Sequence, residues 1–449
     1  MVIKRRSTYS ENPKHVLNTY SYLIDIYMKS KIFNSFIFEY MLLFTLILSA
    51  SSISAPYYAE EHVRVDDTRN ILTFDTAVHR TLNHSHLLNQ GRNEIQGRKG
   101  LVTQAKLYPN PSFGYALENS QYGWKNREDS YVINQLIELG GKREKYVKAA
   151  TYEYYAALIG YEASQLNQLN LLSKAFVRLV AAQELAHLAM QHQRNAEEAF
   201  KLIQIKAEVG KATRIELNKA HIARALADLN VKKSITEFRT AKNNLALFWA
   251  SFNPDFDEVI YPFFDISEPD SLEKYLSRLC DQPEVTQALY KYMAAYENLR
   301  IEKAARIPDV TVSLGYGYDQ GSQGIVAGLS IPLPIWNRNQ GNIQNAYHGM
   351  LKAEDQSKQI QVFLRNKLST AYLELKRAYH DVQDLRDMIL EISNQNLILA
   401  HEGYKEGKLE YWEVLNAQQS VLETEEKHIQ ALVEYHNKRA EIDYLTSLR

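Results

Sequence analysis

The chain of 449 residues contains little cysteine, proline or glycine, and each shortage excludes something. A single cysteine, Cys280, excludes an internal disulfide framework and any four-cysteine zinc or iron–sulfur site within one copy. The 52 Lys and Arg residues balance 53 Asp and Glu residues, so no charge excess favours nucleic acid as a partner, and we expect none. Proline is missing between Pro111 and Pro254 and again after Pro334, so both stretches are open to very long helices.

Signatures of enzymes, cofactor sites and metal sites are also missing. There is no Ser/His/Asp signature and no metalloprotease helix, so we expect neither enzymatic activity nor a cofactor. His84 with His86, and His187 with His192, lack the i,i+4 spacing of paired ligands on a helix. Because no set of three or four ligands is visible either, we expect no dedicated metal site.

The first 55 residues read as an N-terminal extension followed by a secretory signal. Residues 41–50 form an apolar run that is too short to span a bilayer as a helix, and Lys29 and Lys31 precede it. Met28 is a plausible true start. We expect cleavage after export, the alternative being a signal-anchored helix, and no cysteine stands directly after the run to carry a lipid.

Beyond residue 56 no stretch approaches the ~18 uninterrupted apolar residues of a membrane-spanning helix, which excludes a helical membrane protein. Thirty tyrosines nevertheless suggest a membrane–water boundary or a large interface, because the tyrosine ring is apolar and its hydroxyl prefers water. A membrane role would therefore require strands.

Three pairs of segments recur in the same order, about 200 residues apart, and indicate an internal duplication. The pairs are 82–88 with 279–285, 105–109 with 305–308, and 209–220 with 406–417. The sequence therefore predicts a first repeat over 56–250, an equatorial connector over 251–278 and a second repeat over 279–449.

Each repeat is expected to run helix, β-hairpin, long helix, turn, long helix. The strands are predicted over 110–120, 129–137, 309–319 and 323–332, and the helices over 74–106, 142–208, 213–249, 280–306, 340–403 and 410–448. In the strand over 309–319, Val, Leu and Tyr residues alternate strictly with Thr, Ser and Gly residues, which predicts one apolar and one polar face. A soluble antiparallel sheet covered by helices is the alternative.

Four strands per chain are too few for a membrane barrel, because the smallest such barrels have about eight and open edges are not tolerated in lipid. At least two chains would therefore have to share one barrel. A helix of about 65 residues would extend about 100 Å, far beyond a globular core. The rival interpretation is an exported coiled-coil scaffold or adhesin with a small β cap.

The order of elements, the duplication and three short segments together resemble the TolC-type outer-membrane efflux proteins over residues 72–449. The segments are 72–77, 136–143 and 331–341, and the last two resemble most the cobalt–zinc–cadmium efflux branch. The resemblance implies a mixed α+β membrane protein, a homotrimer whose twelve-stranded β-barrel in the outer membrane is continued by a long periplasmic α-helical barrel.

The resemblance also implies a function, that of the exit duct in a tripartite efflux system. Substrate, in this branch divalent heavy-metal cations, would pass passively from an inner-membrane RND-type pump and a periplasmic adaptor (membrane fusion) protein to the exterior. A duct for drug efflux or type I protein secretion is the alternative.

By the same resemblance, the turns over 208–213 and 404–409 are the periplasmic tips, where the tube closes and the adaptor docks. The candidate gate and docking residues are Gly210, Lys211, Thr213, Glu216, Tyr404, Gly407, Lys408, Glu413 and Asn416. Glu216 and Glu413 each follow their glycine by six residues, so three copies would form acidic rings. Asn416 stands where well-known members carry a second acid, which predicts one acidic ring fewer. Plain coiled-coil turns are the alternative.

Prolines and glycines mark the expected junctions between strands and helices, where a fixed φ and a missing donor suit a chain that leaves a β-ladder. These junction residues are Pro109, Pro111, Gly140, Gly141, Pro308, Pro332 and Pro334. Tyr122 and Trp124, close to a predicted β-hairpin tip, are candidates for anchoring at the membrane interface, the alternative being packing within the loop.

Overall fold

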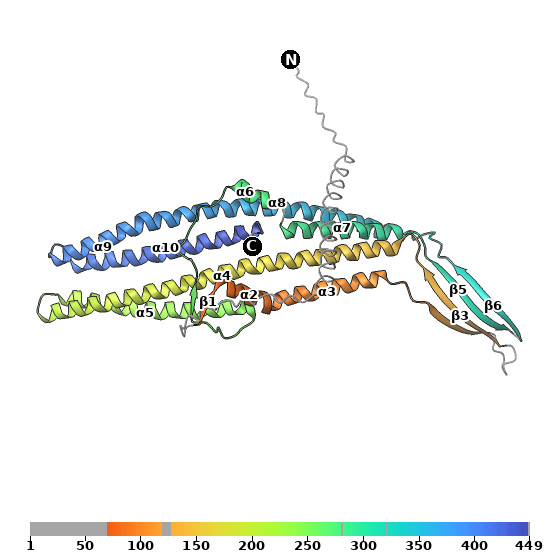
Figure 1. Ribbon diagram of the computed structural model, residues 1–449, viewed down its shortest axis with the longest axis horizontal. Helices are drawn as coiled ribbons and strands as arrows, with labels where there is room; N and C mark the ends of the chain where they lie inside the picture. Colours follow the sequence, from red (N-terminus) through yellow and green to blue (C-terminus); the bar gives the residue numbers. More distant parts are fainter. Residues whose placement is uncertain (1–69, 119–126, 280–281, 320, 448–449) are drawn as a thin grey trace, which may run out of the picture. The chain divides into compact units, whose positions relative to one another are not determined.

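The computed structural model describes residues 70–118, 127–279, 282–319 and 321–447. The expected N-terminal extension and signal, the pair Tyr122 and Trp124, and Cys280 all lie outside the described residues. Within them, long helices run beside one another, with a four-stranded sheet at one end and two helix–helix turns at the other (Figure 1).

The first repeat follows the predicted order of elements. It comprises β1 (Ile71–Thr73), α2 (Phe74–His84), α3 (His86–Lys106), β2 (Ser112–Glu118), β3 (Glu128–Ile137), α4 (Lys142–Glu208), α5 (Arg214–Ala246) and the 3-10 helix η1 (Leu247–Trp249). The single helix expected over 74–106 is divided at Ser85, whose backbone is extended and whose N–H donates to the carbonyl of Thr81. Asn, His and Ser around the break have lower helix propensity than the flanking residues, which favours a break there.

The connector contains regular structure, and the second repeat mirrors the first. The elements are β4 (Glu258–Ile260), α6 (Leu272–Arg278), α7 (Pro283–Ala304), β5 (Val310–Asp319), β6 (Ser322–Ser330), α8 (Gln340–Asp384), the π-helical turn η3 (Leu385–Ile389), α9 (Leu390–Lys405) and α10 (Tyr411–Leu445). The helix expected over 340–403 thus contains one wider turn, η3, between α8 and α9. Strand β4 pairs in parallel with β1.

The hairpins of the two repeats join in one antiparallel sheet of order β2-β3-β5-β6. On one face the apolar side chains are exposed: Phe113 by 69%, Ile133 by 56% and Leu314 by 62%. The opposite face carries mainly Gly and Ser. The alternation predicted for the strand over 309–319 is therefore present, with its apolar side turned outward.

The connector is fixed to both repeats at the middle of the molecule. The side-chain amide of Gln183 on α4 both donates to and accepts from the backbone of Val259. The hydroxyl of Tyr435 on α10 does the same with the backbone of Ser267. Phe176 on α4 is fully buried against the connector's Tyr261, with ring centroids 5.8 Å apart. The largest core cluster forms here, from α4, α8, α10 and the connector.

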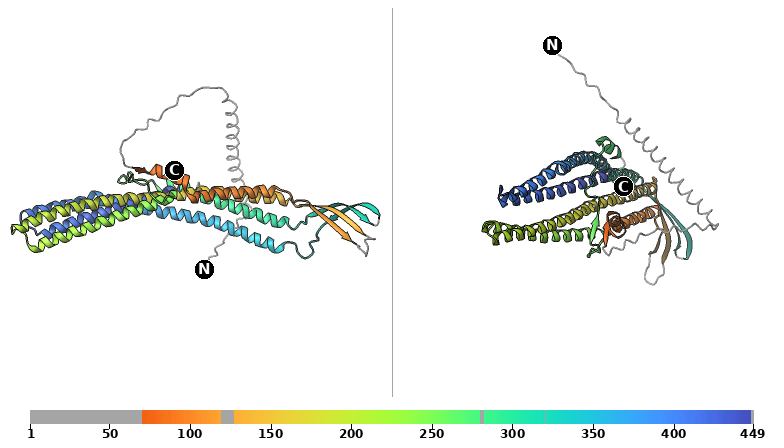
Figure 2. Two further views of the ribbon diagram at one scale, coloured as in Figure 1. Left: turned by 90° about the horizontal axis from the view of Figure 1, so that it is seen from below. Right: turned by 60° about the vertical axis from the view of Figure 1, so that its left-hand side comes forward.

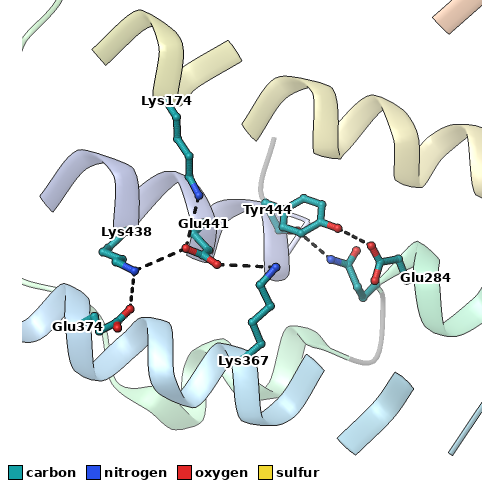
Figure 3. Close-up of polar contacts among 8 residues, drawn as sticks. Lys174, Glu284, Lys367, Glu374, Lys438, Glu441 and Tyr444 are labelled. Carbon is teal, nitrogen blue, oxygen red and sulfur yellow. Dashed lines mark hydrogen bonds and ion pairs between the residues drawn. The ribbon is translucent and has the colours of Figure 1, made fainter. Parts of the chain in front are cut away.

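Ion pairs join three long helices beside this core (Figure 3). Glu441 on α10 lies 3.4 Å from Lys174 on α4, 3.7 Å from Lys367 on α8 and 3.9 Å from Lys438 on its own helix. Figure 2 shows α4 and α5 running alongside α9 and α10. No helix among the described residues has an apolar stretch long enough to cross a membrane.

Candidate tip site and strand–helix junction

The two helix–helix turns adopt the same backbone conformation. Gly210 and Gly407 adopt positive φ angles of 70° and 73°. The next residue, Lys211 or Lys408, donates its backbone N–H to the carbonyl five residues earlier, over 2.7 Å and 2.8 Å respectively. This is the Schellman closure of a helix, in which glycine is favoured because it reaches positive φ without strain. The duplication is thus visible in the hydrogen bonds.

The helices that follow the turns begin differently. Thr213 caps α5 through a capping box, because its hydroxyl accepts from the N–H of Glu216 and the Glu216 carboxylate accepts from the N–H of Thr213 over 2.7 Å. At the corresponding place Glu410 caps α10 without a side-chain bond. Glu413 is exposed, and no hydrogen bond or ion pair of its carboxylate is found within the described part of the chain. Two glutamates that match in sequence therefore differ in chemistry.

Each repeat has a helical hairpin, α4–α5 in the first and α9–α10 in the second. The tips of these two helical hairpins touch through cations of the first repeat and aromatic rings of the second. The ammonium of Lys206 lies 4.2 Å from the ring centroid of Tyr404, and that of Lys219 lies 4.9 Å from the ring of Trp412. The rings of Tyr404 and Tyr411 lie 5.6 Å apart. Such cation–π contacts are worth ~0.5–1 kcal/mol each at exposed sites. No sequence pattern singles out Lys206, Lys219, Tyr411 and Trp412, because only the lateral packing of the two helical hairpins brings them together.

A small apolar cluster lies beneath these contacts and includes Ile203, Ala220, Tyr411 and Val414. The hydroxyl of Tyr411 is buried in it without a hydrogen-bond partner among the described residues. Burial raises the pKa of Tyr411 to about 12, and the nearby Tyr404 and Glu216 act in the same direction. Tyr411 is therefore held in its neutral form.

Two grooves run along the hairpins behind the tips. One, of about 610 Å³, lies between α5 and α10 and is lined by Asn416 and Trp412. The other, of about 480 Å³, lies beside α9 and is lined by Tyr404. His192 on α4 lines both, and burial lowers its pKa, which favours neutral imidazole. In the described parts of the chain no three His, Cys, Asp or Glu side chains gather in a way that could hold a metal ion.

At the strand–helix junction the chain turns through left-handed backbone in both repeats. Gly140 and Gly141 have φ angles of 73° and 64° before α4, and Asn339 has a φ of 60° before α8. The ammonium of Lys142 lies 2.7 Å from the carboxylate of Asp309, which joins the start of α4 to the start of β5. The repeats are therefore tied together where the helices meet the sheet.

The five expected junction prolines all lie outside the helices and strands. They are Pro109 and Pro111 before β2, Pro308 before β5, and Pro332 and Pro334 after β6. The carbonyl of Pro109 accepts a hydrogen bond from Gln135, and that of Pro334 accepts one from Arg338. Since proline lacks an N–H, no ladder bond is lost at these positions.

Comparison with known proteins identifies relatives of this chain. Over 377 residues it is 26% identical to the cobalt-zinc-cadmium resistance protein CzcC of Cupriavidus metallidurans, covering 83% of this chain and 89% of that protein. Over 351 residues it is 22% identical to the cation efflux system protein CusC of Escherichia coli (strain K12), covering 72% of this chain and 73% of that protein. The crystal structure of the outer membrane protein VceC from Vibrio cholerae shares its fold, with a TM-score of 0.70, 17% identity and coverage of 83% of this chain and 95% of that one.

The resemblance to the TolC-type outer-membrane efflux proteins is thereby confirmed. The family model described as outer membrane efflux protein matches residues 77–251 and 276–446, which span both repeats. The matched residues make up most of the chain, so it belongs to the outer membrane efflux protein family.

Proposed function

We propose that this chain is the exit duct of a tripartite efflux system, and that it acts as a homotrimer seated in outer-membrane lipid. The carrying observation is that one end of the chain presents an apolar-faced sheet and the other end two joined helical tips. Strands β2 and β6 each pair along only one edge within the described residues, so three chains could close a twelve-stranded barrel edge to edge.

The proposed cargo is a divalent heavy-metal cation. The names of the relatives CzcC and CusC point to cobalt, zinc, cadmium and cations generally. Conduction would be passive and driven by an inner-membrane RND-type pump, with a periplasmic adaptor protein docking at the tips. Around a threefold axis, three unpaired Glu413 carboxylates would attract cations and repel one another.

Within this proposal the tip contacts have a role in closure. Lys206 with Tyr404, and Lys219 with Trp412, join the two hairpins of one chain. An opening that separates the hairpins must break both cation–π contacts and expose part of the apolar cluster around Tyr411. Glu216 contributes through the capping box, and Glu413 through its charge.

Outer-membrane fractionation, followed by single-channel conductance of the purified trimer, tests the channel proposal. We expect Glu413→Gln to reduce the preference for cations, whereas Glu423→Gln, which removes an exposed carboxylate from the same helix, should have a smaller effect. A soluble protein that does not conduct would overturn the channel proposal and favour the alternative, an exported coiled-coil scaffold. Equal effects of the two variants would remove Glu413 from the gate.

The cargo requires a separate experiment. A strain lacking this gene should become sensitive to cobalt, zinc or cadmium salts and recover when the gene is restored. Unchanged metal resistance combined with sensitivity to organic drugs would instead assign drug efflux. Loss of a secreted protein would assign type I secretion.

A further inference from the structure

The outward face of the sheet has a sharp polar limit near the hairpin tips. Tyr115, Tyr131 and Tyr316 lie in register as one row across three strands. The next row on this face lies nearer the loop between β2 and β3. In it Asp129 is buried and accepts a hydrogen bond from the Tyr115 hydroxyl over 2.8 Å and another from Arg127. Aromatic rows are typical of membrane–water interfaces, and an ionic pair is costly in hydrocarbon. Exposed Leu117 and Tyr318 share the row of Asp129, so the apolar band ends between the tyrosine row and this row.

The apolar rows below this limit are too few for a membrane. From Tyr131 to Ile137, where the pairing of β3 with β5 ends, the strand covers about 20 Å at about 3.3 Å per residue. With a strand tilt of about 40°, this gives about 15 Å along the membrane normal, against an apolar band of about 25 Å. The missing ~10 Å must lie beyond the end of the ladder, on the helix side.

The strand–helix junction supplies apolar surface at that level. Trp336 is 87% exposed, Leu333 76% and Tyr108 71%. These side chains stand on the segments that enter and leave the sheet, outside the ladder, where prolines prevent further pairing. The set of exposed apolar junction residues, named here the junction collar, consists of Leu107, Tyr108, Ile307, Leu333, Ile335 and Trp336.

Cations accompany the collar on each segment. Exposed Lys106 precedes Leu107 and exposed Arg306 precedes Ile307. Arg338 is exposed two residues after Trp336. A fourth cation, the guanidinium of Arg143, lies 3.6 Å from the ring of Tyr108. Exposed aromatic and aliphatic side chains next to Lys and Arg are suited to the lipid headgroup layer, where rings meet the acyl boundary and cations meet phosphate.

We infer that the junction collar binds the phospholipid surface on the helix side of the outer membrane and completes the apolar band that the strands leave short. The inference rests on the proposed membrane function. It assigns the membrane boundary to the linkers between strand and helix rather than to the strands themselves. A second copy of the chain is a less suitable occupant, because every collar segment carries a cation and the collar continues the apolar face of the sheet.

Depth-dependent fluorescence quenching tests this inference. The full chain carrying Trp124→Phe is reconstituted into phosphatidylethanolamine–phosphatidylglycerol vesicles with spin-labelled phosphatidylcholine. We expect labels near the headgroup to quench the fluorescence of Trp336 more than labels near the chain ends. The other two tryptophans, Trp249 on η1 and Trp412 at the helical tip, lie outside the collar and should contribute no quenching. Adding Trp336→Phe should abolish most of this quenching.

A matched control places a tryptophan elsewhere on the exposed surface. Phe252, 92% exposed between η1 and β4, is changed to Trp in the Trp124→Phe, Trp336→Phe background and should remain unquenched. If Trp336 is not quenched in vesicles that conduct, the inference that the collar binds lipid is wrong, whereas the proposed channel function is retained. Blue-shifted, unquenched emission would place a second copy over the collar and also overturn it. Failure to insert at all would overturn the proposed function itself.

Discussion

At the scale of single residues, a duplicated position need not keep its role. Glu216 and Glu413 stand at matching places after their turns, yet only Glu216 binds the backbone of its own cap. The carboxylate of Glu216 stabilises the start of α5, and the carboxylate of Glu413 remains available to ions. A sequence pattern identifies the position, whereas the hydrogen bonds assign the chemistry.

This difference predicts unequal effects of the same substitution. Glu216→Ala removes half of a capping box and should destabilise the start of α5 by about 1 kcal/mol, whereas Glu413→Ala should cost only a few tenths for its α10 terminus. Hydrogen exchange of the backbone amides in the first turn of each helix measures both. Equal acceleration in the two helices would contradict the assigned roles.

Tyr411 predicts a dependence on alkaline pH. Its pKa is raised to about 12 from the ordinary value of 10, so the folded tip favours the neutral phenol. The stability gained in this way is fully present below pH 10 and is lost as the pH rises through about 12. Tyr411→Phe removes a buried hydroxyl that has no hydrogen-bond partner in the described part of the chain, so it should cost little at pH 8 and should lessen the alkaline loss.

The measurement is thermal unfolding of wild type and Tyr411→Phe between pH 8 and pH 12. All other tyrosines remain in both proteins, so only the difference between the two curves reports on Tyr411. Parallel curves over the whole range would contradict the prediction.

At the scale of elements, a local sequence pattern predicts those helices and strands whose formation depends on residues within one segment. Proline-free apolar periodicity predicted α4, and strict alternation predicted β5, because both signals lie within one segment. The break at Ser85 and the pairing of Lys206 with Tyr404 could not be predicted in the same way. The break balances small propensities, and the pairing depends on how two distant hairpins pack.

Close approach of β3 and β5 gives a prediction for two glycines on the same face of the sheet. A Cβ added to Gly315 would lie 2.3 Å from the carbonyl oxygen of Tyr131, whereas one added to Gly324 meets nothing within 4 Å. Gly315→Ala must push two backbones apart and should destabilise the sheet by about 1–3 kcal/mol. Gly324→Ala should be neutral or slightly stabilising, because alanine restricts the unfolded chain.

Gel mobility of the unheated assembly, followed by its melting temperature, compares the two variants. Gly315→Ala should lower both the yield of the assembled form and its melting temperature. Equal behaviour of the two variants would show that the strands separate more easily than the close contact indicates.

At the scale of the whole molecule, the two repeats are tied together at three levels. Lys142 and Asp309 join them at the junction, the connector joins them at the core, and the cation–π contacts join them at the tips. Duplication explains why matching elements occur, whereas each of these ties joins residues of different types from the two repeats or the connector. These contacts between the repeats therefore cannot be predicted from the repeated sequence pattern, and only the packing of the folded chain reveals them.

The ion-pair cluster of Figure 3 provides a test of how firmly the middle of the molecule holds. The side chain of Glu441 is only 18% exposed and lies near Lys174, Lys367 and Lys438. Glu441→Gln removes the negative charge near Lys174, Lys367 and Lys438, and of these three only Lys438 keeps a carboxylate partner, Glu374, among the described residues. Because breaking a buried pair costs about 3–5 kcal/mol and this one is partly solvated, we expect a loss of about 1–3 kcal/mol.

Glu374→Gln is the matched control, since Glu374 is 41% exposed and, among the described residues, forms an ion pair with Lys438 only. An exposed pair of this kind contributes at most about 1 kcal/mol. Thermal unfolding at low and high salt separates the causes, because repulsion among the lysines should weaken as salt is added. A larger loss in Glu374→Gln, or a loss in Glu441→Gln that salt leaves unchanged, would show that packing rather than charge holds α4, α8 and α10 together.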